Sequence, residues 1–112
     1  MKKALFFLIT LAFVLPLSAA AETWKNVAVV DTMCSVKAKA APDEHTTKCA
    51  LACSNSGFGI LTADGTYLKF DAAGNAKVVA ALKQTKKTDH LRATVTGERD
   101  GDTVKVQSFS LD

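Results

Sequence analysis

The sequence lacks the motifs that mark the common catalytic and nucleotide-binding sites. It contains no glycine-rich phosphate loop, no nucleophile elbow, no paired-carboxylate motif and no C-x-x-C redox motif. It also has no internal repeat, no low-complexity segment and no interdomain linker. These absences argue against an enzyme and predict a single domain with a binding or structural role.

Residues 22–112, which remain after the first 21 residues are excluded, also lack a large net charge. Residues 1–21 have a basic start, an apolar run of about fourteen residues and a small-residue end, as secretory signal peptides do. Lys2 and Lys3 lie in this segment, so residues 22–112 keep twelve basic residues against eleven acidic ones. A net charge of +1 offers little attraction for nucleic acid. We expect a periplasmic or secreted domain over 22–112, with no membrane span after cleavage.

Cysteines are few and odd in number. The three are Cys34, Cys49 and Cys53. In an oxidising compartment at most one pair can bridge within the chain. The sequence predicts a disulfide from Cys34 to Cys53 or Cys49, closing a loop of about 15 to 19 residues and contributing about 3 kcal/mol. We expect a monomer, with a dimer linked through the odd cysteine as the alternative.

Alternating apolar residues and D-G turns predict a mainly β chain with α+β character. Strands are predicted over residues 24–31, 58–62, 66–70, 90–98 and 103–111. Helices are predicted from about 44 to 54 and from about 76 to 84, and a loop over 33–41. This order predicts a five-stranded OB-like barrel with one helix between strands 3 and 4. The cysteine-bearing helix would be inserted between strands 1 and 2; an open α+β sheet is the alternative.

A set of motifs resembles a group of small exported bacterial proteins of unknown function. The motifs are Asp31-x-x-Cys34, His45, Cys49-x-x-x-Cys53, a Tyr67-Leu68 strand and a closing Val95-Thr96-Gly97 strand. The resemblance spans nearly all of the mature chain. It implies an OB-like barrel and an uncharacterised binding or structural module, and it implies no activity.

The cysteine-rich stretch also suggests a metal-binding or thiol-redox module as the alternative function. His45, Cys49 and Cys53 are spaced four apart, so on the predicted helix they would share one face. The outer two would then lie about 12 Å apart along the axis, too far to share one ion. A four-ligand zinc or copper site would need Cys34 from the loop, with Asp31 or His90 as a further donor.

The remaining candidates form a weaker prediction. Asp31, Tyr67 and Arg92 could contribute to a ligand surface, as OB-like domains often bind on one face of the barrel. The partner would be a small ligand or a protein. The sequence names neither.

Overall fold

The computed structural model describes residues 20–112. The predicted signal peptide, residues 1–21, therefore lies almost entirely outside the described residues. The elements, in chain order, are β1 (Glu22–Asp31), η1 (Thr32–Cys34), α1 (Ser35–Ala38), η2 (Pro42–Glu44), α2 (Thr47–Ala52), η3 (Ser54–Ser56), β2 (Phe58–Leu61), β3 (Tyr67–Phe70), α3 (Ala72–Gln84), β4 (Arg92–Asp100) and β5 (Thr103–Leu111).

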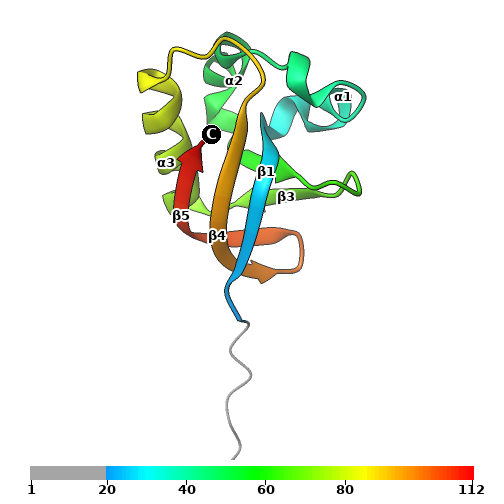
Figure 1. The fold of residues 1–112 in the computed structure, drawn as a ribbon, viewed down its shortest axis with the longest axis vertical. Helices are drawn as coiled ribbons and strands as arrows, with labels where there is room; N and C mark the ends of the chain where they lie inside the picture. The colour runs from blue at the N-terminus through cyan, green and yellow to red at the C-terminus, as the bar shows by residue number, and fades with distance from the viewer. Residues whose placement is uncertain (1–19) are drawn as a thin grey trace, which may run out of the picture.

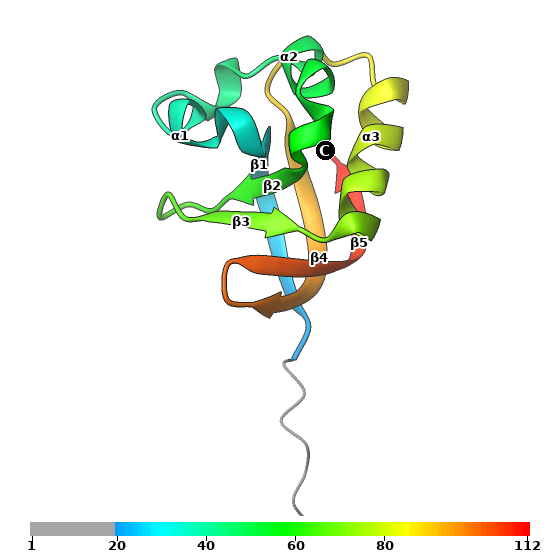
Figure 2. The ribbon, with the colours of Figure 1, turned by 180° about the vertical axis from the view of Figure 1, so that it is seen from behind.

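The strands form a closed barrel in the order β1-β2-β3-β5-β4, and β4 pairs with β1 to close it. All pairings are antiparallel except that of β3 with β5, which is parallel. This mainly β architecture, with α3 between β3 and β4, confirms the predicted OB-like fold. Figure 1 shows β1 and β4 running side by side, and Figure 2 shows β2 and β3 from the opposite side.

β1 is the longest strand, and it bends so that it pairs with two neighbouring strands. Its first half pairs with β4, and its second half, Ala28 to Asp31, pairs with β2. The register slips between Trp24 and Val27, where Asn26 takes a left-handed φ of 52°. Such a bulge bends a strand and increases its twist, which helps a small sheet to close. The end of β1 is thereby held against β2, and it is there that the candidate site begins.

The apolar side chains divide into two clusters. The main core fills the barrel and receives Val78 and Leu82 from α3. A smaller cluster lies under α1 and consists of Ala28, Val30, Ala38 and Leu61, with Cys34 and Tyr67 packed against it. Because side chains alternate along β1, Val29 enters the first cluster while Ala28 and Val30 enter the second. The second cluster anchors the segment between β1 and β2 on the outside of the barrel.

The helices differ from the sequence prediction more than the strands do. The helix predicted over 44–54 is wrong at both ends, since α2 covers only Thr47–Ala52. The predicted loop over 33–41 contains η1 and α1. α3 begins four residues before the predicted start of 76, at Ala72. Among the residues that the structure describes, no helix is long and apolar enough to cross a membrane.

Asp71 explains the early start of α3. Its side chain is the N-cap, and Oδ1 accepts hydrogen bonds from the backbone N of Gly74 at 3.0 Å and of Val106 at 3.2 Å. One oxygen therefore fixes both the first turn of α3 and its position on β5. N-cap side chains satisfy backbone donors that the helix itself leaves unpaired.

We expect Asp71→Ala to lower the free energy of unfolding by about 1–2 kcal/mol, because it removes an N-cap. Asp71→Asn keeps an oxygen that caps equally well and is the matched control. Chemical denaturation of both variants measures the difference. Equal stability of Asp71→Ala and the wild type would contradict this role.

Candidate functional site

The candidate site is built on Asp31, the last residue of β1. Among the described residues it is the one charged side chain that is fully buried, with 0% exposure. Its backbone pairs with Phe58 of β2, so the barrel holds it rigidly. A buried carboxylate must be hydrogen-bonded, because leaving it unpaired in an apolar interior is costly. The two oxygens of Asp31 each have a partner.

The first oxygen starts the helical segment that carries Cys34. Asp31 is the N-cap of η1, and its Oδ2 accepts a hydrogen bond from the backbone N of Cys34 at 3.0 Å. This hydrogen bond explains the D-x-x-C spacing, because an N-cap oxygen binds the backbone N–H two or three residues further on. The cap also brings the Cys34 side chain beside the carboxylate.

The second oxygen is bound by His45. Nε2 of His45 lies 2.6 Å from Oδ1 of Asp31, and the His45 side chain is only 9% exposed. An ionised carboxylate only accepts hydrogen bonds, so Nε2 carries the hydrogen and donates it. His45 lies between η2 and α2, not on a helix. The predicted stripe of His45, Cys49 and Cys53 on one helix face is therefore wrong.

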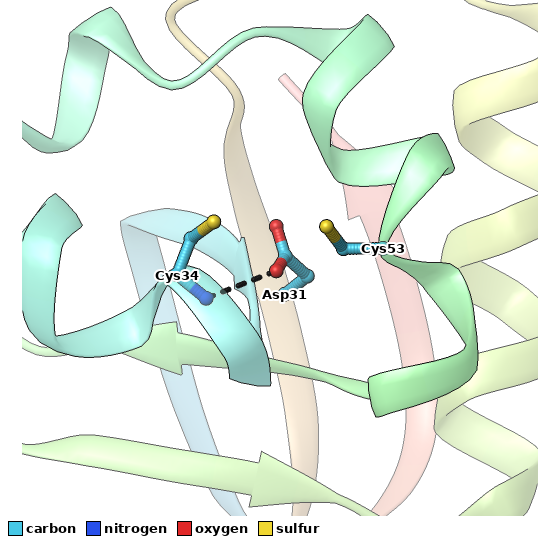
Figure 3. A group of neighbouring side chains, drawn as sticks. All are labelled: Asp31, Cys34 and Cys53. Atoms are coloured by element: carbon cyan, nitrogen blue, oxygen red, sulfur yellow. Dashed lines mark hydrogen bonds between the residues drawn. The ribbon is translucent and has the colours of Figure 1, made fainter.

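Cys53 completes the group from the other end of α2. It is the C-cap of that helix, and its backbone N donates to the carbonyl of Cys49. Oδ of Asp31, Sγ of Cys34 and Sγ of Cys53 all lie within 4.8 Å of one another. We call these three residues the Asp31 cluster. Figure 3 shows both sulfurs pointing to the same side as the carboxylate oxygen that Cys34 N does not bind, which is Oδ1.

The three cysteines occupy different environments. All are free thiols; Cys34 and Cys53 are half-buried and Cys49 is exposed. The structure thus brings together Cys34 and Cys53 and leaves Cys49 outside the Asp31 cluster. The predicted disulfide is not formed, and of its two predicted partners Cys53 is the one placed beside Cys34 in this group.

The Cys34 thiol is held in its protonated form. Partial burial raises the pKa of Cys34, and the nearby negative charge of Asp31 raises it further. A raised pKa lowers the fraction of thiolate, which is the nucleophilic form. A bound cation would reverse this effect because it stabilises the thiolate.

A pocket of about 260 Å³ lies beside the cluster, on the side of Cys34. Its lining comprises Cys34, Lys37, Ala38, Ala41, Glu44, His45, Thr46 and Cys49. Cys34 therefore belongs both to the pocket and to the Asp31 cluster, whereas Asp31 and Cys53 are not part of the lining. Cys34 and His45 both line the pocket and both bind the buried carboxylate.

The other predicted site residues lie apart from the cluster or support it indirectly. Arg92 forms a two-point ion pair with Asp43, at 2.7 and 3.0 Å. His90 is exposed and bonds to the neighbouring Asp89. The predicted ligand surface of Asp31, Tyr67 and Arg92 stays a prediction, and Asp31 itself is buried.

Tyr67 braces the segment that carries the site. Its hydroxyl donates to the carbonyl of Val30 at 3.1 Å and lies 3.1 Å from the hydroxyl of Thr32. Gly59 makes room for its ring, since a Cβ there would lie 2.7 Å from a ring atom. Burial, with a smaller effect of the Asp31 charge, raises the pKa of Tyr67 to about 12.

The chain contains one tyrosine, so its ionisation can be followed directly by ultraviolet absorbance. We expect a midpoint near pH 12, against about 10 for an unfolded tyrosine. Because the folded-state pKa is the higher one, this contribution to stability is fully present below pH 10 and is lost as the pH rises toward 12. Tyr67→Phe should lack that loss, and a wild-type midpoint near 10 would contradict the buried hydroxyl.

The sequence carries a partial signal for the cluster. It predicts Asp31 as a further metal donor or as part of a ligand surface, and the D-x-x-C spacing is itself an N-cap pattern. No local pattern marks Cys53 as a helix C-cap beside Asp31.

Comparison of the chain with protein-family models, with curated proteins and with solved structures found no significant match. The resemblance to small exported OB-like proteins therefore stays a prediction.

Proposed function

We propose that the protein is a small exported, non-enzymatic binding module whose Asp31 cluster holds a thiophilic metal ion. The observation that carries this proposal is the convergence of two thiols and a buried carboxylate oxygen within 4.8 Å of one another. Cysteine sulfur and carboxylate oxygen are both ligands of zinc. Copper(I), which prefers sulfur, is the second candidate ion.

The distances support an ion more readily than a covalent bridge. Zinc–sulfur and zinc–oxygen bonds of about 2.3 and 2.0–2.2 Å at tetrahedral angles put the ligand atoms roughly 3.6–3.8 Å apart. The ligand atoms lie within 4.8 Å of one another, so they would have to approach by about 1 Å at most to bind one ion. Small side-chain rotations supply this movement. A disulfide needs the sulfurs at about 2.05 Å, a larger movement.

The charges of the Asp31 cluster also support a metal ion. Without a cation, burial and, after it, the negative charge of Asp31 raise the pKa of Cys34 and disfavour its thiolate. A divalent ion compensates the carboxylate and the two thiolates together, so binding releases the thiol protons. A thiol kept protonated is a poor nucleophile, which favours binding over catalysis.

His45 would be an outer partner of the ion that binds the Asp31 carboxylate and not the ion itself. Nε2 already donates to Oδ1, and a carboxylate oxygen keeps a further lone pair for an ion. Tetrahedral geometry would separate a directly bound nitrogen and oxygen by about 3.3 Å, more than the 2.6 Å observed. His45 therefore suits an outer role, orienting Asp31. Three protein ligands leave a fourth position for a water or an incoming group.

We expect the reduced mature chain to bind one zinc ion, and Cys34→Ser or Cys53→Ser to weaken binding by more than about 100-fold, since a direct ligand should matter more than an outer partner. Cys49→Ser should bind as the wild type does. Calorimetric titration measures the affinities. Alkylation followed by intact mass provides a second readout: zinc should protect two thiols and leave Cys49 reactive.

Alkylation of all three thiols in the presence of saturating zinc would contradict the metal site. Cys49→Ser is the matched control, because it removes a thiol from the same pocket without removing a proposed ligand. Loss of zinc binding in all three variants alike would also contradict the assignment of ligands.

The second candidate function is a structural domain stapled by a Cys34–Cys53 disulfide. It is favoured by the closeness of the two sulfurs and by the predicted export. A bridge there would tie η1 to the end of α2 beside Asp31. It predicts that protein purified from the periplasm without reductant is lighter by two hydrogens and accepts a single alkyl group.

We expect His45→Ala to weaken zinc binding by about 10- to 100-fold, because it removes an outer partner of a liganding carboxylate. His45→Gln retains a hydrogen-bond donor and should recover part of the loss. Stability of the metal-free variants, measured by thermal unfolding, separates this effect from misfolding. An unchanged affinity in His45→Ala would show that the Asp31–His45 bond plays no part in binding.

A further inference from the structure

The sulfurs of Cys34 and Cys53 are available for two kinds of chemistry. They lie within 4.8 Å of each other and of an Asp31 carboxylate oxygen, whereas Cys49 lies outside this group. A sulfur that binds an ion as a thiolate and a sulfur in a disulfide are two different chemical states of the same atom. The pair can therefore hold an ion or form a bridge, but it cannot do both at once.

We propose that the metal site is regulated by redox: oxidation of Cys34 and Cys53 to a disulfide expels the ion, and reduction restores the site. This inference rests on the proposed metal-binding function and adds the way in which binding is regulated. The oxidant is a small-molecule disulfide, the chemical class to which glutathione disulfide belongs. The ion-bound form and the bridged form are then two states of one site.

The oxidation balances as two successive thiol–disulfide exchanges. One cysteine thiolate attacks a sulfur of the incoming disulfide and releases the first small thiolate. The other cysteine thiolate attacks the mixed disulfide, which forms the Cys34–Cys53 bond and releases the second small thiolate. The two cysteine sulfurs lose two electrons, and the incoming disulfide gains them. The ion keeps its oxidation state and leaves to solvent, since the bridge offers no thiolate ligand.

The positions of the two cysteines permit both states. A bridge requires the sulfurs to move from at most 4.8 Å to about 2.05 Å, an approach of up to about 2.7 Å. Cys34 lies where η1 meets α1, and Cys53 lies between α2 and η3. Neither residue belongs to a barrel strand, so this approach breaks no strand pairing.

The buried carboxylate stays compensated in both states. Its two hydrogen bonds come from the backbone N of Cys34 and from Nε2 of His45, and neither bond uses a thiol. The oxidised site therefore needs no new partner for the charge of Asp31. The oxidant can also reach the pair, because both cysteines are only half-buried and Cys34 lines the pocket of about 260 Å³.

The test uses the linkage between zinc and the reduction potential of the pair. A ligand that binds only the reduced form stabilises that form in proportion to its occupancy. Once free zinc exceeds the dissociation constant, each tenfold rise in zinc should lower the midpoint potential by about 30 mV, since one ion is exchanged for two electrons. The mature chain is equilibrated at fixed pH in glutathione redox buffers of measured free zinc. Alkylation and intact mass then count the reduced thiols.

Two controls accompany the titration. Cys49→Ser should show the same dependence on zinc as the wild type, because Cys49 is outside the Asp31 cluster. Magnesium at the same concentrations should leave the potential unchanged, because it prefers oxygen ligands to thiolates.

A midpoint potential that does not change with zinc, in a chain that calorimetry shows to bind zinc, would overturn the redox regulation. A bridge through Cys49, located by peptide mapping, would also overturn it, as would equal zinc affinities of the oxidised and reduced forms. If the reduced chain binds no zinc in calorimetry, the proposed function itself fails, and this result is distinct from the other three.

Discussion

The buried carboxylate of Asp31 is the constraint on which the candidate site depends. An uncompensated charge in the interior costs several kcal/mol, so the chain must supply partners for both oxygens. Cys34 supplies a backbone N–H and His45 supplies a ring N–H, at 3.0 and 2.6 Å. These bonds draw two segments of the insert between β1 and β2 onto the end of one strand. The same carboxylate therefore organises the local fold and creates the proposed site.

The barrel and the insert contribute different properties to this site. The barrel fixes Asp31, whose strand pairs with β2, and the backbone N of Thr32 bonds to the carbonyl of Gly57 at 2.9 Å. The insert contributes the thiols on short helical segments, which adjust more easily than barrel strands. A fixed carboxylate with adjustable thiols suits the closure of about 1 Å that an ion requires. Either an ion or a disulfide at Cys34 and Cys53 would tie the insert together.

Much of the fold was predictable from the sequence, because strands with alternating side chains and D-G turns carry local signals. The residues 103–111 were predicted as a strand with the observed bounds. The insert was harder. Pro42-Asp43-Glu44 has the form of a helix start, yet it makes only the short η2, and Asp43 instead pairs with Arg92. The α2 helix starts at Thr47, and the hydroxyl of the preceding Thr46 caps it. Cys34 and Cys53 come close together only through the tertiary structure, so no local sequence pattern predicts their proximity.

The central claim is that zinc binds through two cysteines and a carboxylate, and X-ray absorption spectroscopy of the zinc-loaded protein tests it most directly. The account predicts an average of two sulfur neighbours at about 2.3 Å and nitrogen or oxygen neighbours at about 2.0–2.2 Å. A shell without sulfur would contradict the role of the thiols. Three sulfur neighbours would make Cys49 a resident ligand and would contradict the site as described.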